Sequence, residues 1–365
     1  MRIVIISNND WDGLWYQRQQ FAAMYAQKGN DVLFVNKTLQ RLPKIKDFAD
    51  RFFKKKTNNR IVKNAVPHNI TVINIYTLPP FKAINWLNKI IIKLKFRNFE
   101  YKNCDLLITY VPSFTSLDII EYLHPRKSAY INVHNYDADN VIKDLLKSER
   151  IMVNKVNYLF GDSVYNMNRL KRINKHREIH SSLPGVDTAR FKVSFRTDEH
   201  KRAKSIYYFG GIGDHLDFEI YNSLSKDYEV VFIGKFNEDS FKSKVSERIK
   251  IIPPVANDEL PKYLLEADII GIFYQSTQYV RGVIPAKIYE CMATKKPILT
   301  KGIYEMTSFQ PAVYICENEA GIRLILQNIS DSETQEIVEL REALAENANW
   351  ATRFKDLNKR MELDV

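Results

Sequence analysis

The segment that decides the fold is residues 280–300, which read VRGVIPAKIYECMATKKPILT. This pattern predicts a loop, a helix opened by Pro285, a break at Lys295 and Lys296, and then a strand. A helix N-terminus presents unpaired N–H groups and about half a positive charge, so it attracts phosphate. Glu290, one turn further on, is placed to accept hydrogen bonds from sugar hydroxyls. The segment therefore predicts a pocket for a sugar nucleotide.

A simpler interpretation is that Ile284, Ile288 and Met292 form the buried face of an ordinary amphipathic helix. Three features together argue against it. A proline stands at the expected first helical position, Lys287 and Glu290 lie three residues apart on one face, and a Lys-Pro-Ile strand start follows.

The same residues resemble the P-x-K-x-Y-E-x-x-A-x-x-K-P-[IV] donor-site signature of GT-B glycosyltransferases, in particular family 4-like enzymes that build bacterial surface polysaccharides. The resemblance implies a retaining transfer from a UDP-, GDP- or dTDP-sugar to a saccharide or lipid-diphosphate-linked saccharide. No cofactor is implied. The residues that would contact the donor here are Arg281, Val283, Ile284, Pro285, Ala286, Lys287 and Glu290.

The size and composition of the chain favour two domains. Its 365 residues are more than a single hydrophobic core usually supports. Hydrophobic residues make up 45% of the chain, which is enough for two cores. The three cysteines, Cys104, Cys291 and Cys316, suggest neither disulfides nor a metal cluster. No signal-peptide core and no apolar run of about 20 residues is evident, so we expect a cytoplasmic protein.

The positive charge is concentrated near the N-terminus. Residues 1–100 hold 18 lysines and arginines against 6 acidic residues, within a net charge of +11 for the chain. The excess lies in 44–63 and in 82–97, where lysines alternate with Trp86 and aliphatic residues. The second stretch is suited to the cytoplasmic face of an anionic membrane, or else it is a core helix whose lysines reach solvent.

Short apolar strands alternate with helical stretches in both halves, which predicts an α/β protein of two Rossmann-like parallel sheets facing across a cleft. We expect an acceptor domain over 1–190, joined by a C-terminal helix over 346–365, and a donor domain over 191–345. The predicted strands are 3–7, 31–35, 70–75, 105–109, 129–133 and 156–160, followed by 205–209, 229–233, 249–252, 269–273, 297–300 and 313–315.

Two further patches carry the resemblance to GT-B enzymes. Residues 183–191, LPGVDTARF, are similar to their N-G-V-D-x-x-x-F interdomain junction, with Pro184 in place of Asn. Residues 349–354, NWATRF, resemble their N-x-W-x-x-R-F end, in which the last helix returns to the N-terminal domain. The first patch alone is also compatible with an ordinary turn.

The loop after the first strand is the main candidate for acceptor binding. Residues 9–20 read NDWDGLWYQRQQ and stand where a doubly wound sheet binds ligands. The W-D-G-L-x-x-x-R pattern is similar to teichuronic-acid-type glycosyltransferases, which implies that Asp12, Trp15 and Arg18 contact the acceptor. Gly13 would let the backbone approach the donor. The pattern departs from G-x-G-x-x-G, which argues against a nicotinamide enzyme.

His134 and Asp137 are the candidate catalytic residues. They follow the predicted strand over 129–133, where GT-B enzymes commonly place a His or Asp facing the transferred sugar. A solvated loop histidine is the alternative.

A glycine-rich loop follows the first strand of the second half. In FGGIGD over 209–214, Gly211 and Gly213 would let backbone amides approach a diphosphate. Backbone near Pro254 and Val255 would frame the base. The family's second glutamate is replaced by Gly282, and its Arg/Lys pair after the glycines is missing, so Arg281 and Lys287 would supply the charge.

Other chemistry lacks support in the sequence. Zinc, P-loop and hydrolase motifs are absent, and Asp137-Ala138-Asp139 has D-x-D spacing in the wrong half, so we expect no metal. A sugar-nucleotide epimerase remains an alternative because it shares this architecture. A nucleic-acid-binding protein is a weaker one, because the basic region carries no recognition motif.

Overall fold

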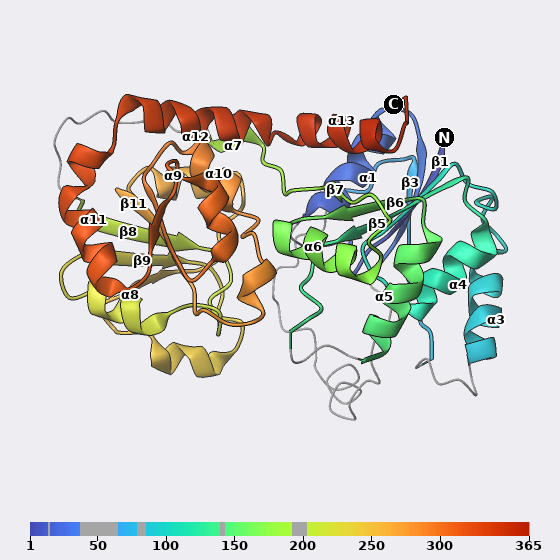
Figure 1. The fold of residues 1–365 in the computed structure, drawn as a ribbon, viewed down its shortest axis with the longest axis horizontal. Helices are drawn as coiled ribbons and strands as arrows, with labels where there is room; N and C mark the ends of the chain where they lie inside the picture. The colour runs from blue at the N-terminus through green and yellow to red at the C-terminus, as the bar shows by residue number, and fades with distance from the viewer. Residues whose placement is uncertain (14, 37–64, 79–84, 139–142, 192–202, 365) are drawn as a thin grey trace. The chain divides into compact units, whose positions relative to one another are not determined.

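The computed structural model describes residues 1–13, 15–36, 65–78, 85–138, 143–191 and 203–364. The chain forms two compact units (Figure 1). The first contains Met1–Tyr136, Asn140–Ser182 and Phe354–Val365, and the second contains Asp137–Asp139 and Leu183–Arg353. The chain thus leaves the first unit at Ser182, earlier than the expected boundary at residue 190.

The first unit is built on a seven-stranded parallel sheet in the order β3-β2-β1-β4-β5-β6-β7. Since β2 and β3 lie on one side of β1 and β4 to β7 on the other, the order reverses between β1 and β4, where an open sheet binds ligands. The strands are β1 Arg2–Ile6, β2 Asp31–Val35, β3 Ile70–Ile73, β4 Leu106–Thr109, β5 Lys127–Asn132, β6 Tyr158–Gly161 and β7 His180–Ser181. The helices are α1 Gln17–Gln27, α3 Asn85–Phe96, α4 Phe114–Leu123, α5 Lys143–Lys155 and α6 Val164–Ile173.

The second unit has a six-stranded parallel sheet in the order β10-β9-β8-β11-β12-β13, which reverses between β8 and β11. Its strands are β8 Ser205–Phe209, β9 Glu229–Ile233, β10 Lys250–Ile252, β11 Ile269–Phe273, β12 Ile298–Lys301 and β13 Tyr314–Cys316. Its helical segments are α7 Thr188–Phe191, α8 Phe218–Leu224, η1 Asp239–Lys244, α9 Leu260–Leu264, η2 Val280–Gly282, α10 Ile288–Ala293, η3 Tyr304–Phe309, α11 Glu319–Ser332 and α12 Gln335–Asn347.

The expected α/β fold of two Rossmann-like sheets is confirmed. Strands β2, β8, β9 and β11 have the predicted bounds, and the other predicted strands differ only at their ends. Their continuous apolar runs are buried on both faces, as parallel strands covered by helices require. The strands β3, β10 and β13 are only partly buried, and the two residues of β7, His180 and Ser181, carry no apolar pattern.

The two motifs that resembled the junction and the C-terminal end lie against each other in the second unit. Val186 donates its amide to the Ala348 carbonyl at 3.0 Å, and Trp350 donates its own to the Val186 carbonyl at 3.2 Å. A Cβ at Gly185 would lie 2.5 Å from the Trp350 ring, so only glycine fits here. The tryptophan therefore packs directly on the junction.

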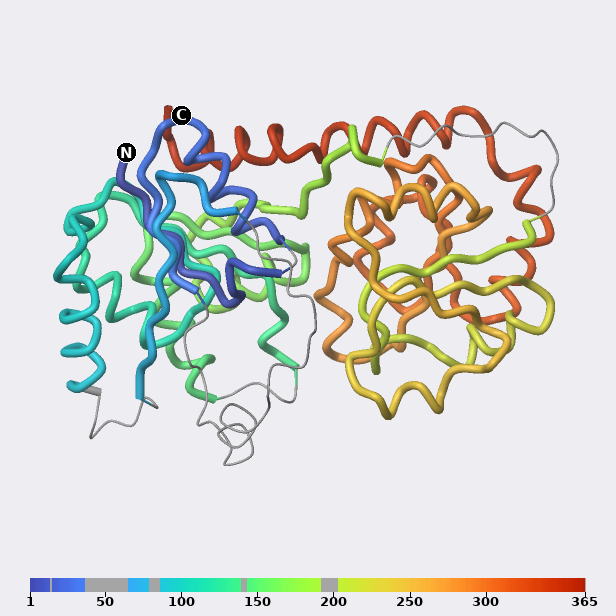
Figure 2. The backbone as a smooth tube through the Cα atoms, turned by 180° about the vertical axis from the view of Figure 1, so that it is seen from behind, coloured from blue at the N-terminus to red at the C-terminus, as the bar shows by residue number. Residues whose placement is uncertain are grey.

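The last helix, α13 Trp350–Arg360, begins in the second unit and ends in the first. Phe354 packs edge-on against Phe21 and Tyr25 of α1, with ring centroids 5.7 and 4.6 Å apart. The Tyr25 hydroxyl donates to Asn358 Oδ1 at 2.7 Å. Figure 2 shows this end of the chain beside the N-terminal strands and α1. The predicted return of the C-terminal helix is confirmed.

Helix α3 presents apolar residues on two sides. Ile92 and Phe96 are buried against the first unit, whereas Trp86, Ile90 and Leu94 are 59%, 43% and 52% exposed. These three are spaced by four residues, so they line up on one outward face, the α3 stripe. The basic stretch 44–63 and Lys82 lie outside the described residues. None of the helices in the described ranges combines the length and hydropathy needed to cross a bilayer.

Candidate functional site

The loop after β1 places the predicted acceptor residues beside the point where the first sheet reverses. Gly13 has a φ of 101°, which favours glycine. Asp12 is exposed, whereas Trp15 is half-buried and packs edge-on against Trp11 with ring centroids 5.0 Å apart. Helix α1 follows, and its Tyr16 amide donates to Gln19 Oε1 at 3.0 Å.

Arg18, on the first turn of α1, is buried with only 6% of its surface exposed. Its guanidinium lies over the rings of Tyr16 and Tyr110, 5.1 and 5.3 Å from their centroids. Burial lowers the pKa of Arg18 from its ordinary value. Tyr110 directly follows β4, so residues from both sides of the sheet reversal meet at this arginine.

His134 follows β5 at the same edge of the sheet. Its Nε2 lies 2.6 Å from Asn8 Nδ2, and its amide donates to Asn132 Oδ1 at 2.9 Å. Burial, with a smaller contribution from the Arg18 charge, lowers the pKa of His134 to about 4. The imidazole is therefore neutral at physiological pH and can exchange hydrogen bonds without carrying charge.

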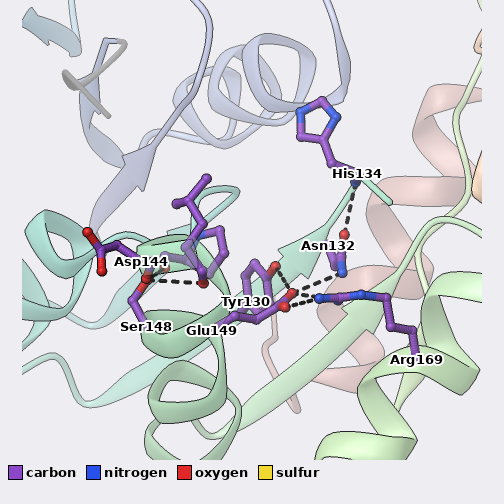
Figure 3. Close-up of polar contacts among 9 residues, drawn as sticks. Tyr130, Asn132, His134, Asp144, Ser148, Glu149 and Arg169 are labelled. Carbon is purple, nitrogen blue, oxygen red and sulfur yellow. Dashed lines mark hydrogen bonds and ion pairs between the residues drawn. The ribbon is translucent and has the colours of Figure 1, made fainter. Parts of the chain in front are cut away.

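A buried polar network holds the end of β5 beneath His134 (Figure 3). The Glu149 carboxylate accepts from the Tyr130 hydroxyl at 2.7 Å, from Asn132 Nδ2 at 3.2 Å and from Arg169 Nη1 at 2.8 Å. Arg169 and Glu149 are almost completely buried, and a second bond joins Arg169 Nη2 to Glu149 Oε2. Because Asn132 also accepts the His134 amide, this network fixes the His134 backbone.

This network belongs to none of the motifs in the sequence. The available signal was a glutamate on the buried face of α5, spaced with Met152 and Val153. Such a buried carboxylate requires a cationic partner. Figure 3 shows the His134 ring turned away from the Glu149–Arg169 pair.

Asp137, the second predicted catalytic residue, is exposed and belongs to a short segment assigned to the second unit. The structure therefore does not bring Asp137 together with His134 within one unit.

In the second unit, the predicted glycine loop follows β8 and lies against Asn237. A Cβ added at Gly211 would lie 3.0 Å from Asn237 Oδ1, and one at Gly213 would lie 2.4 Å from Asn237 Nδ2. The backbones also pair, since the Asn237 amide donates to the Ile212 carbonyl at 2.8 Å. Asn237 was not predicted, because its approach depends on β9 lying beside β8.

Lys287 reaches the same loop from a distant part of the sequence. Its Nζ donates to the Phe209 carbonyl and lies 4.0 Å from the centroid of the Tyr208 ring. Gly210 has a φ of 124°, and a Cβ there would lie 2.5 Å from Lys287 Nζ. Burial lowers the pKa of Lys287 to about 8. No carboxylate within the described part of the chain forms an ion pair with this cation.

Glu290 lies one helical turn after Lys287 and is partly buried. Burial raises the pKa of Glu290 to about 7, although the charges of Lys287 and Arg190 act in the opposite direction. Burial therefore favours the protonated form of Glu290 more than water does. The structure places Lys287 against the glycine loop and Glu290 one turn further along α10.

The predicted start of the helix at Pro285 is wrong. Helix α10 begins at Ile288, whose amide donates to the Pro285 carbonyl at 2.9 Å in a tighter turn. Of the amides expected to face phosphate, that of Val283 already donates to the Val280 carbonyl, and Pro285 has no N–H. The amides of Ile284 and Ala286 remain as candidates.

The other predicted donor residues lie on nearby loops. Arg281 and Ala286 are exposed, Ile284 and Pro285 are buried, and Val283 is half-buried. Pro254 is exposed and Val255 half-buried in the segment after β10. Among the described residues, no hydrogen bond or ion pair joins Arg281 to the glycine loop.

A cluster of three rings beneath the glycine loop was not predicted. The Tyr208 hydroxyl donates to the Gly211 carbonyl at 2.8 Å and lies 3.2 Å from His215 Nε2. The His215 ring packs edge-on against Tyr274, with centroids 4.7 Å apart. Burial, followed by the Lys287 charge, lowers the pKa of His215 to about 4. Tyr274 follows β11, so the cluster joins the two strands at which the second sheet reverses.

Comparison with known proteins identifies the architecture. No protein-family model matches the chain, and no curated protein matches it. Solved structures do match over nearly the whole length. HepE of Anabaena in complex with UDP-glucose superposes with a TM-score of 0.69 at 13% identity, covering 99% of both chains. Sucrose-phosphate synthase of Thermosynechococcus elongatus gives 0.69 at 12% identity, covering 98% of both chains. A glycosyltransferase of Rickettsia africae gives 0.69 at 14%, covering 99% of this chain and 98% of the other. The chain has the GT-B fold.

The GT-B fold was expected from four short motifs, and the superposition covers the regions between them as well. At identities of 12% to 14%, the likeness concerns the fold. The narrower resemblance to family 4 and to teichuronic-acid-type enzymes stays a prediction.

Proposed function

We propose that this protein transfers a glycosyl group from a nucleotide diphosphate sugar to a saccharide acceptor. The observation that carries the proposal is the meeting of Lys287 with the glycine loop in a GT-B fold. Lys287 is a cation without a carboxylate partner, beside a backbone that leaves no room for a side chain at Gly210. A diphosphate would supply the missing negative charge, and stabilising the leaving diphosphate is usually the largest catalytic term.

Structures with this fold support a nucleotide sugar as the donor, because the HepE structure holds UDP-glucose. In the proposed arrangement Lys287 and Arg281 bind the diphosphate, and Glu290 accepts hydrogen bonds from the ribose hydroxyls. His134 and Asp137 would face the transferred sugar. Since the charge comes from side chains, we propose that no metal ion takes part. We also propose that the anomeric configuration is retained, and the support for this is the resemblance of residues 285–298 to the family 4 donor-site signature.

The acceptor we propose is a saccharide of bacterial surface polysaccharide synthesis, carried on a lipid diphosphate at an anionic membrane. The support is the α3 stripe of Trp86, Ile90 and Leu94, flanked by the exposed Lys93 and Lys95. Apolar burial and attraction to anionic lipid act together in such a helix. Lys89 adds less, because its Nζ pairs with Glu121 at 3.2 Å.

Thermal shift with UDP-, GDP- and dTDP-sugars tests the donor, because a ligand at 100 times its Kd adds about 2.7 kcal/mol of stability. Glu290→Ala should weaken the donor that binds by about 1.5–3 kcal/mol, roughly 10- to 150-fold in Kd. A folded variant with unchanged donor affinity would falsify the assignment. An epimerase would convert the sugar without an acceptor, whereas a transferase releases nucleoside diphosphate when the acceptor is added.

A further inference from the structure

Arg18 is a buried cation in the first unit without an anion to neutralise it. It forms no ion pair with any residue that the structure describes, and its buried Nε has no hydrogen-bond partner. The charge of Asp162 favours the charged form of Arg18 without contacting it. Asp162 Oδ1 accepts a hydrogen bond from Asn166 Nδ2 at 2.8 Å instead. Another buried arginine of the same unit has such an anion, since Arg169 is paired with Glu149.

The contacts of Arg18 with the rings of Tyr16 and Tyr110 do not balance its burial. A cation–π contact recovers less free energy than the burial of an ion costs. The Nε–H also needs an acceptor, which a ring above or below the guanidinium plane does not provide. An arginine kept in such a place is therefore best explained by a ligand.

Three other polar atoms on the loops after β1 and β4 are buried with no hydrogen-bond partner among the residues that the structure describes. Two are donors, the Tyr110 hydroxyl and Trp15 Nε1, and the third is Asn8 Oδ1. Tyr110 is itself 1% exposed and its ring touches the guanidinium. The donors come from the loops after β1 and β4, which flank the reversal of the first sheet. A ligand at this edge of the sheet would meet a cation and neutral donors.

We infer that Arg18 and Tyr110 bind an oxyanion, a phosphate or a carboxylate, carried by a substrate of this protein. A guanidinium offers parallel N–H groups that match either anion. This inference deepens the proposed function and rests on it for the word substrate, because it gives the molecule at the first unit an acidic group. That group belongs either to the acceptor or to the donor diphosphate.

The test compares full-length Arg18→Met with wild type by thermal shift, in inorganic phosphate or acetate against chloride at constant ionic strength. Wild type should melt at a higher temperature in phosphate or acetate, and Arg18→Met should lose that rise. Without the anions, Arg18→Met should melt at the wild-type temperature or above, because it removes an unpaired buried charge. Arg169→Met is the matched control and should melt lower, since it leaves Glu149 unpaired.

Two further probes identify the source of the anion. If Arg18→Met weakens UDP binding at least tenfold, the anion is the donor diphosphate. If UDP binding is unchanged while binding of glucose 6-phosphate or glucuronate relative to glucose is lost, the anion belongs to the acceptor. Arg172 supplies the control, because it is exposed and its Cζ lies 5.8 Å from the centroid of the Tyr165 ring. The variant Arg172→Met should behave as wild type.

The inference is overturned if Arg18→Met responds to phosphate and acetate as wild type does, or if it is destabilised as strongly as Arg169→Met. Failure of the proposed function gives a different result. In that case Glu290→Ala keeps its affinity for nucleotide sugars while Arg18→Met still loses the anion response.

Discussion

At the scale of single residues, burial moves two neighbouring pKa values toward each other. The pKa of Lys287 falls to about 8 and that of Glu290 rises to about 7. Below pH 7 the Glu290 carboxylate gains a proton and can no longer accept two ribose hydroxyls. Above pH 8 Lys287 loses the charge that attracts a diphosphate. Donor affinity should therefore be highest between about pH 7 and pH 8.

Isothermal titration of the donor nucleotide across pH measures this profile. Affinity should fall by up to about tenfold per pH unit on each side, because each limb depends on one proton. Lys287→Arg keeps the charge and should extend the plateau above pH 8, whereas Glu290→Gln should remove the acidic limb. A wild-type profile that is flat from pH 6 to 9 would contradict both assignments.

His134 and Asp137 should affect turnover more than binding. His134→Ala and Asp137→Ala should each lower kcat by about a hundredfold and change donor affinity little, as expected of groups that act in the transition state. Because the pKa of His134 is about 4, wild-type kcat should show no inflection near pH 6.5 that depends on this residue. Exposed His176 supplies the control, His176→Ala. Wild-type turnover in both the His134→Ala and Asp137→Ala variants would show that this loop takes no part in catalysis.

At the scale of elements, α3 is the part of the described chain with the clearest outward apolar face. Replacing Trp86, Ile90 and Leu94 together by serine should reduce co-sedimentation with anionic vesicles at least about tenfold, since each side chain contributes roughly 1.5–3 kcal/mol when fully buried. Activity on a soluble acceptor should be retained. Leu324→Ser, at another exposed leucine, is the control.

Charge on α3 should make the same binding sensitive to salt. Lys93→Glu with Lys95→Glu should weaken vesicle binding by about 1 kcal/mol per lysine at low salt, and Lys89→Glu should do less. Competition with duplex DNA distinguishes membrane binding from nucleic-acid binding. Added DNA should displace the vesicles only from a protein that binds nucleic acid. If wild type ignores anionic vesicles at low salt, the membrane proposal fails.

Strands were easier to predict than the site, for a physical reason. A buried parallel strand such as β11 is a continuous apolar run, so its first and last residues can be identified from the local sequence. The contacts of Lys287 with Phe209 and of Gly213 with Asn237 depend on strand order, which local sequence does not encode. The motif predicted that Lys287 matters, but not that Tyr208 lies beneath it. The start of α10 failed because proline suits a helix start without requiring one.

At the scale of the whole molecule, the fold depends on a short segment that returns from the second unit to the first. Phe354 is 3% exposed and fills the space between Phe21 and Tyr25. Phe354→Ala should destabilise the first unit by about 3–5 kcal/mol, the range for truncating a buried phenylalanine. Denaturant unfolding, with each unit followed separately, measures this because two units need not unfold in one step. Exposed Lys355→Ala should leave the midpoint unchanged, and an unchanged midpoint for Phe354→Ala would contradict the packing.

The return of α13 also sets the order in which the protein can mature on the ribosome. Strands β1 to β7 emerge first, but Phe354 and Asn358 are added only after the whole second unit has been translated, about 10 to 30 s later at typical rates. During that interval the apolar face of α1 is not covered by Phe354. The first unit is therefore translated first but completed last, and a nascent chain that stalls before Phe354 exposes this face to chaperones and proteases.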